Sequence, residues 1–104
     1  MNTLSRHVDE IIDRRAKLLS YMGGEHRLRV LIILRQGEAS VRFLAKETGL
    51  THSALSQHLA KLRKAKLVKT RRDGQTIHYS CSSPAVLKML DVLDEIYRKP
   101  DEDL

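Results

Sequence analysis

Apolar residues recur every three or four positions along five stretches of the chain. In the first stretch, Val8, Ile11 and Ile12 are followed two helical turns later by Leu18 and Leu19, a pattern that predicts an amphipathic helix. The five predicted helices span residues 4–22, 25–36, 41–48, 52–64 and 84–98. The sequence therefore predicts a mainly helical protein.

One segment has the alternating pattern of strands instead. Residues 66–72 and 75–81 flank Asp73-Gly74, a dipeptide that tolerates the positive φ angles of tight hairpin turns. Every second residue of the later strand is apolar or a thiol, ending at Cys81. One face of a small β-hairpin is therefore expected to be buried, with Cys81 as an inert buried thiol.

The third and fourth helices carry the spacing of a helix-turn-helix. Ala45 is small where two helices cross, Gly49 gives the turn its backbone freedom, and Leu55 fills the core beneath it. A buried helical hairpin of another kind is the alternative. The order helix, helix, helix-turn-helix, hairpin, helix predicts a winged helix-turn-helix, with residues 1–99 as one domain and 100–104 as an acidic tail.

The fourth helix has one apolar face and one polar face. At about 100° per residue, Leu55, Leu59 and Leu62 fall together and define the core side, and His58 lies beside them as a partly buried residue. The opposite face suits the major groove of double-stranded DNA, where Gln57 can form two hydrogen bonds to adenine. The predicted base contacts are Ser53, Gln57, Ser56 and His52, and the predicted backbone contacts are Lys61, Arg63 and Lys64.

Positive charge is concentrated in one part of the sequence. The chain has 19 basic and 13 acidic residues, for a formal net charge of +6. Residues 61–72 hold seven of the basic residues and no acidic one, whereas acidic residues dominate the last fourteen positions. This distribution suggests a surface that contacts a polyanion, and an ordinary solvated basic face is the alternative that the charges alone leave open. The hairpin residues expected to contact DNA as a wing are Arg71, Arg72, Gln75 and Thr76.

Other classes of protein fit the sequence less well. A chain of 104 residues holds one domain, and it lacks a Ser/His/Asp set, a metal-ligand cluster and a glycine-rich phosphate loop, so an enzyme is not expected. No apolar run approaches the roughly 20 residues that cross a bilayer, and the N-terminus lacks the apolar core of a secretion signal. The single cysteine fits a reducing compartment. We expect a cytoplasmic protein that does not bind membranes.

Three segments of the chain resemble one bacterial family. The segments 22–31, 50–59 and 71–80 are similar to the entry of the second helix, the recognition helix and the wing of ArsR/SmtB-type repressors. The likeness extends over about residues 15–97, and within the family it is strongest to the nodulation repressors of rhizobia. It implies a homodimer built mainly from the first and last helices, which represses transcription by occupying promoter DNA.

The apolar stripes of the first and last helices agree with this implication. Both stripes are larger than a three-helix core requires, although a role in the core alone is the alternative. The expected interface residues are Val8, Ile11, Ile12, Leu19, Leu90, Leu93 and Tyr97.

The chain departs from the family where many members sense metals or oxidants. Residues 38–44 lack the Cys-x-Cys pair of metal sensors, and residues 84–97 contain carboxylates but no histidine, a poor ligand set for zinc. A dithiol switch would need a second cysteine, and His7 and His26 are expected to be isolated on the surface. We expect no metal and no cofactor. A sensor with an unrecognised effector site, or a winged helix that binds proteins, remains the alternative.

Overall fold

The computed structural model describes residues 3–100, so all but the first residue of the predicted tail at 100–104 lies outside it. Within the described residues, five helices and three short strands form the fold, which confirms the predicted winged helix-turn-helix architecture. In chain order the elements are α1 (Thr3–Met22), α2 (Glu25–Gln36), β1 (Ala39–Ser40), α3 (Val41–Thr48), α4 (His52–Lys64), β2 (Val68–Asp73), β3 (Thr76–Cys81) and α5 (Pro84–Tyr97).

The sheet has one strand more than the predicted hairpin. Its order is β1-β3-β2 with both pairings antiparallel, and β1 places Ala39 opposite Tyr79. β1 is only two residues long, which is too short to produce an alternating pattern in the sequence. The turn is also one residue later than predicted, because Asp73 pairs with Thr76 and Gly74 takes the positive φ of 62°.

The core is organised around α2. Val30 and Leu31 of α2 are completely buried, as are Leu44 of α3 and Leu55 of α4. α2 contacts α1, α3, α4, α5 and β3, so it joins every other helix to the sheet. Burying a leucine contributes roughly 1.5–3 kcal/mol, and we therefore regard this cluster as the main source of the fold's stability.

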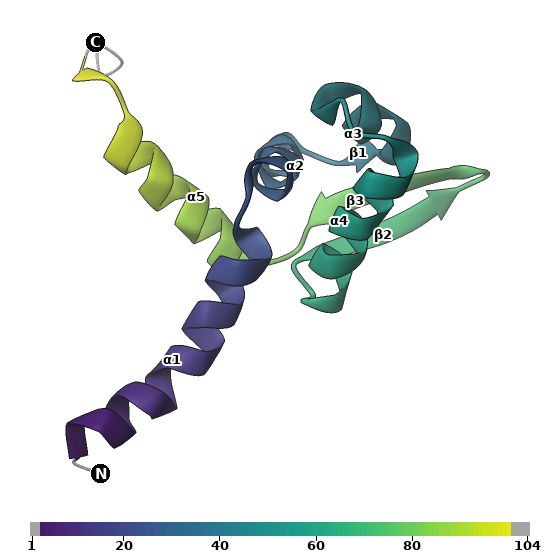
Figure 1. Cartoon of the computed structure of the whole chain (residues 1–104). Coiled ribbons are helices and arrows are strands. Elements are labelled where there is room, and N and C mark those ends of the chain that lie inside the picture. The colour runs from purple at the N-terminus through teal and green to yellow at the C-terminus, as the bar shows by residue number, and fades with distance from the viewer. Residues whose placement is uncertain (1–2, 101–104) are drawn as a thin grey trace.

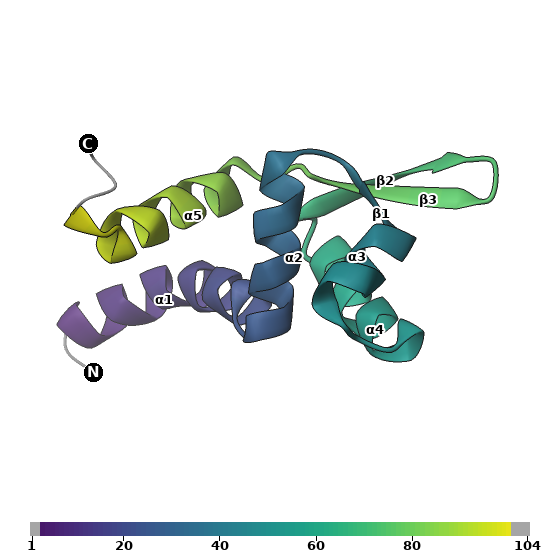
Figure 2. The ribbon, with the colours of Figure 1, turned by 90° about the horizontal axis from the view of Figure 1, so that it is seen from above.

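The molecule consists of a head and two arms. The head contains α3, α4 and the sheet, whereas α1 and α5 diverge from α2 on the opposite side, with the two termini at the far ends of the arms (Figure 1). Seen from above, the β2–β3 hairpin extends away from both arms (Figure 2). The extents of 56 × 40 × 22 Å reflect this elongated arrangement.

Hydrogen-bonded caps define where α3 and α5 begin. The side-chain oxygen of Ser40 accepts a hydrogen bond from the backbone N–H of Phe43 at 3.0 Å, which begins α3. Ser83 accepts one from Val86 at 3.2 Å, which begins α5. Such caps satisfy backbone donors that have no partner within the helix. They fix the direction in which α3 and α5 leave the sheet.

Two sequence predictions about buried residues require correction. Leu90, predicted to lie in a dimer interface, is buried within the chain with 2 % of its surface exposed, because it packs on the core beside Val86. Cys81 is only half-buried, with its Sγ 3.9 Å from the carbonyl oxygen of Ser83. It lies at the end of β3, where the chain leaves the sheet.

Candidate nucleic-acid interface

The polar face of α4 is exposed as the sequence predicted. Leu55, Leu59 and Leu62 are buried in the core, which turns the opposite side of the helix outward. The exposed residues on and beside that side are His52, Ser53, Ser56, Gln57, Lys61, Arg63 and Lys64. The structure thus brings all seven predicted α4 contacts to the surface of one helix.

The turn between α3 and α4 fixes where this face begins. Gly49 ends α3 with a φ of 68°, and its N–H donates to the carbonyl of Ala45 at 3.0 Å. The Thr51 hydroxyl then accepts a hydrogen bond from the N–H of Ala54 at 3.2 Å and caps α4. The predicted spacing of Ala45 and Gly49 is therefore explained by this turn, and Ser53 projects from the first turn of α4.

A groove of about 860 Å³ separates α4 from the wing, by which we mean the β2–β3 hairpin. It brings together three predicted α4 contacts and two predicted wing contacts, namely His52, Ser56, Arg63, Gln75 and Thr76. We call it the wing groove. Sequence analysis missed three further polar residues that line it, which are Ser40, Arg42 and His78.

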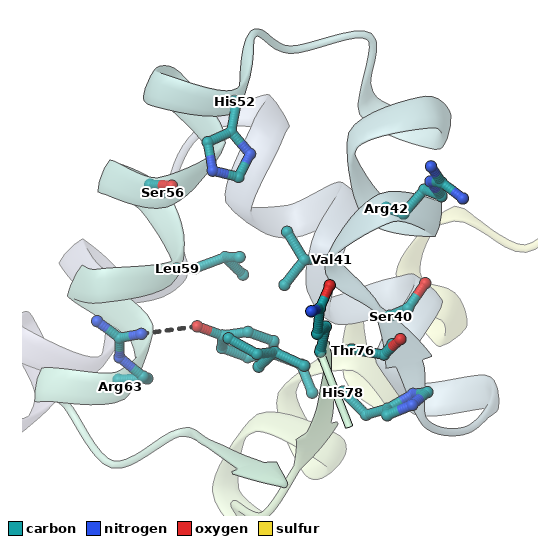
Figure 3. Close-up of a pocket in the computed structure, with 12 residues that line it drawn as sticks. Ser40, Val41, Arg42, His52, Ser56, Leu59, Arg63, Thr76 and His78 are labelled. Carbon is teal, nitrogen blue, oxygen red and sulfur yellow. Dashed lines mark hydrogen bonds between the residues drawn. The ribbon is translucent and has the colours of Figure 1, made fainter. Parts of the chain in front are cut away.

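The missed residues depend on the pairing of β1 with β3. This pairing places Ser40 opposite His78 and brings the start of α3 to the edge of the wing groove. In Figure 3 Val41 and Leu59 point toward one another across an apolar floor. An apolar floor with a polar, basic rim is suited to a DNA strand whose phosphates contact the rim.

Arg63 links the recognition helix to the sheet. Its Nη1 donates a hydrogen bond to the hydroxyl of Tyr79 at 2.8 Å (Figure 3), and Tyr79 is buried in the core. A guanidinium has five N–H donors, so this bond leaves others for an anion in the wing groove. Arg63 therefore both orients α4 and contributes positive charge to the groove.

Arg71, predicted to contact DNA from the wing, lies exposed on β2 and forms an ion pair with Glu38. Its Nε and Nη2 donate to the two carboxylate oxygens of Glu38 at 2.8 and 2.7 Å. The hydrogen bonds from Arg71 lower the pKa of Glu38, and the carboxylate raises the pKa of Arg71. The charge of Arg71 is thus compensated within the protein, and the pair joins the wing to the segment before β1.

Arg72 lies on the other face of the wing. Successive side chains of a strand point to opposite sides, and Arg72 is opposite Ile77 in the sheet register. Arg72 therefore shares one face of the wing with Ile77, and Arg71 shares the opposite face with His78. Within residues 3–100 no carboxylate forms an ion pair with Arg72, and its full charge is available to a phosphate.

Most of the apolar residues on the arms are exposed in the single chain. Val8, Ile11, Ile12 and Leu19 of α1 are between 38 and 58 % exposed, and Tyr97 of α5 is 78 % exposed. Leu93 is half-buried against the core. Six of the seven predicted interface residues therefore retain exposed apolar surface, and Leu90 is the exception already described.

Two histidines form a contact that the sequence did not suggest. His26 was expected to be isolated on the surface, but its ring lies 5.6 Å from the ring of His58. Both are half-buried between α2 and α4. Burial lowers the pKa of His58, and the positive charges of Arg27, His26 and Lys61 lower it further. The partly buried position predicted for His58 is confirmed.

Within residues 3–100 no three His, Cys, Asp or Glu side chains are grouped in a way that could hold a metal ion. The same part of the chain contains no helix with the length and apolar character needed to cross a membrane.

Comparison with known proteins identifies the family. Residues 24–70 match the model described as "Bacterial regulatory protein, arsR family". The nodulation protein NolR of Rhizobium meliloti is 55 % identical over 82 residues, which cover 79 % of this chain and 67 % of that protein. The chain belongs to the arsR family. The transcriptional activator HlyU of Vibrio cholerae, 45 % identical over 77 % of this chain and 74 % of its own length, is a further relative.

The solved structures agree with this assignment. The crystal structure of NolR from Sinorhizobium fredii superposes with a TM-score of 0.79 at 47 % identity and covers 93 % of this chain and 94 % of its own. Membership of the arsR family confirms the predicted DNA-binding transcriptional regulator and the predicted absence of enzyme activity. The similarity to NolR also confirms the resemblance to nodulation repressors.

Proposed function

We propose that this arsR-family protein binds an inverted-repeat operator as a homodimer and represses transcription by occupying promoter DNA. The observation that carries the proposal is the exposed polar face of α4 beside the wing groove. A recognition helix in the major groove, with a hairpin on the adjacent backbone, is the way in which related helix-turn-helix folds contact DNA. The protein is proposed to act in the cytoplasm of a bacterium.

Base recognition is assigned to the first half of α4. Gln57 can form a bidentate contact with adenine, and Ser53 can reach a base edge, with Ser56 and His52 in support. All four side chains are exposed and lie near the end of α4 that Thr51 caps. These residues therefore determine which sequence is bound.

Affinity for the DNA backbone is assigned to the basic residues around this face. Lys61, Arg63 and Lys64 come from the second half of α4, and Arg72 comes from the wing. Gln75 at the turn and Thr76 beside it add polar contacts to phosphate. Arg71, which is paired with Glu38, instead holds the wing in place.

The homodimer is assigned to the arms. Exposed apolar surface on α1 and α5 would be removed from water in a dimer, at roughly 25 cal/mol per Å². Two recognition helices would then enter successive major grooves about 34 Å apart and contact the two halves of an inverted repeat. Blocking a promoter in this way explains repression without a further activity.

Selection of bound fragments from random and genomic DNA tests the proposal. The purified full chain is incubated with the pool near physiological salt, with reductant present, and bound duplexes are sequenced. We expect enrichment of one palindromic motif, and a reporter placed behind it should be repressed. Increased reporter expression would favour an activator, as HlyU is named. No enrichment beyond bulk DNA would overturn the proposal and favour a missing effector or a protein-binding role.

A further inference from the structure

A second concave surface lies on the side of α4 that faces α1 and α2. It has a volume of about 320 Å³ and is lined by Lys17, Ser20, Tyr21, Arg27, Lys61 and Lys64. We call it the basic groove. Lys61 and Arg63 are two residues apart, so they lie roughly 160° apart around a helix with 3.6 residues per turn. Because Arg63 lines the wing groove, the two grooves are on opposite sides of α4, with Ser53 and Gln57 between them.

The basic groove contains four cationic side chains and no carboxylate. Lys17 forms only an exposed pair with Asp13 at 3.4 Å, and such pairs contribute little. Within residues 3–100, Arg27, Lys61 and Lys64 form no ion pair. These cations come from three helices that converge, and their mutual repulsion favours an anion between them.

Buried side-chain nitrogens of Arg27 and of two nearby histidines also lack hydrogen-bond partners among the described residues. The Nε of Arg27 and the Nδ1 of His58 are buried without a hydrogen-bond partner among the described residues, as is the Nδ1 of His26. The pKa of His58 is lowered first by burial and then by the positive charges of Arg27, His26 and Lys61, so several cationic groups lie close to this histidine. An anion bound by Arg27 would compensate their positive charge.

The positive charges continue beyond the groove in a row along α1. A neighbouring hollow of about 640 Å³ shares Lys17, Tyr21 and Lys64 and adds Arg14 and Arg15. The cations therefore extend beyond the basic groove into the neighbouring hollow. This arrangement fits the repeated phosphates of a nucleic-acid strand better than one small anion.

We propose that the basic groove binds the phosphate backbone on the side of the major groove opposite to the wing. Each protomer then contacts both strands that border the groove, one in the wing groove and one in the basic groove. Because α1 is an arm of the proposed dimer, this second strand lies toward the centre of the operator. The inference rests on the proposed function and adds Lys17 and Arg27 to its phosphate contacts.

Salt-dependent binding of the full chain to DNA tests this inference. The double variant Lys17→Gln/Arg27→Gln is compared with Lys88→Gln, which removes a positive charge from exposed α5 outside both grooves. Affinity is measured by fluorescence anisotropy at several salt concentrations, on a duplex carrying the selected motif and on a scrambled duplex. We expect the double variant to bind both duplexes more weakly. The slope of log affinity against log salt concentration should be shallower by about two. Lys88→Gln should match the unsubstituted chain.

The outcomes separate this inference from the proposed function. An unchanged salt slope in the double variant, with normal binding by the unsubstituted chain, overturns the inference and leaves the proposed function standing. The inference is also overturned if Lys88→Gln loses as much affinity and salt dependence as the double variant. Failure of the unsubstituted chain to bind any duplex overturns both.

A small free anion is the alternative ligand for the basic groove, because it carries the same kind of charge as a DNA phosphate. If inorganic pyrophosphate raises the Tm of the unsubstituted chain but not of the double variant, and the salt slopes are equal, the groove binds a free anion and not DNA. Circular dichroism and sedimentation confirm that each variant is folded and has the same oligomeric state. If the double variant is unfolded, Lys17→Gln alone, which alters an exposed side chain, should reduce the slope by about one.

Discussion

Glu38 and Arg71 form a bidentate ion pair, with N–O distances of 2.8 and 2.7 Å, between the segment that precedes β1 and the wing. The two residues are 33 positions apart in the sequence. Planar arginine–carboxylate pairs of this kind have defined geometry as well as favourable energy. The pair therefore separates two adjacent arginines of the wing into different roles, because Arg72 has no such partner among residues 3–100.

We expect Arg72→Ala and Arg71→Ala to affect DNA binding differently. Arg72→Ala should make the dependence of log affinity on log salt shallower by about one, since it removes one available phosphate contact. Arg71→Ala removes a charge that Glu38 already compensates, and its slope should stay close to that of the unsubstituted chain. Anisotropy titrations on one duplex compare the two variants, and identical slopes would show that the pair opens on binding.

Gln57→Ala should weaken binding to the selected motif by about 1–3 kcal/mol and relax the preference at one base step. Lys64→Ala, one of the backbone contacts proposed above, provides the matched comparison because it should weaken binding on all sequences alike. Repeating the fragment selection with each variant measures both effects. Equal weakening of Gln57→Ala on motif and scrambled duplexes would remove Gln57 from the base contacts.

The stability of the fold should decrease in mildly acidic solution. The pKa of His58 is lowered in the folded chain by burial and by nearby positive charge, so below about pH 6.5, the ordinary histidine pKa, the unfolded chain binds more protons. The free energy of unfolding then decreases as the pH falls through this range. We expect Tm to fall as the pH is lowered through this range. In His58→Gln we expect Tm to fall less.

His7→Gln is the control for this effect, since His7 is exposed on α1. It should leave the dependence of Tm on pH unchanged. If His58→Gln also leaves it unchanged, another group accounts for the loss of stability in acid.

Ile12→Glu should convert the proposed dimer to a monomer without unfolding the head. Ile12 is 52 % exposed in the single chain, so a charge there is costly only where a partner covers it. Sedimentation measures the oligomeric state, and circular dichroism measures folding. Leu90→Ala is the contrast, because it removes a buried side chain and should cost about 2–5 kcal/mol of stability. A dimer that persists in Ile12→Glu would place the interface elsewhere.

The sequence predicted those features that depend on local spacing. The core side of α4 follows from the period of Leu55, Leu59 and Leu62, and the turn at Gly49 follows from its need for a left-handed backbone. Both could be inferred from residues a few positions apart. The same reasoning identified the exposed face of α4 that carries Gln57.

Features that depend on distant residues were not predictable in this way. The partner of Arg71 is Glu38, and the basic groove joins Lys17 to Lys61, so each requires knowledge of how separate elements meet. Leu90 belongs to an apolar stripe that serves both the core and the exposed side of α5. The spacing of a stripe shows that its residues leave water, but it does not show whether they pack within the chain or against a partner.

The exposure of α1 has a consequence for how the regulator responds to its own abundance. Met22 is the buried residue of this 20-residue helix, and in proteins most of the stability of a helix comes from the packing of its apolar face. In the proposed homodimer, ordering of α1 and association of two chains are therefore a single equilibrium. While monomers predominate, the dimer concentration rises with the square of the chain concentration. Doubling synthesis of the chain would then raise the supply of operator-binding species about fourfold.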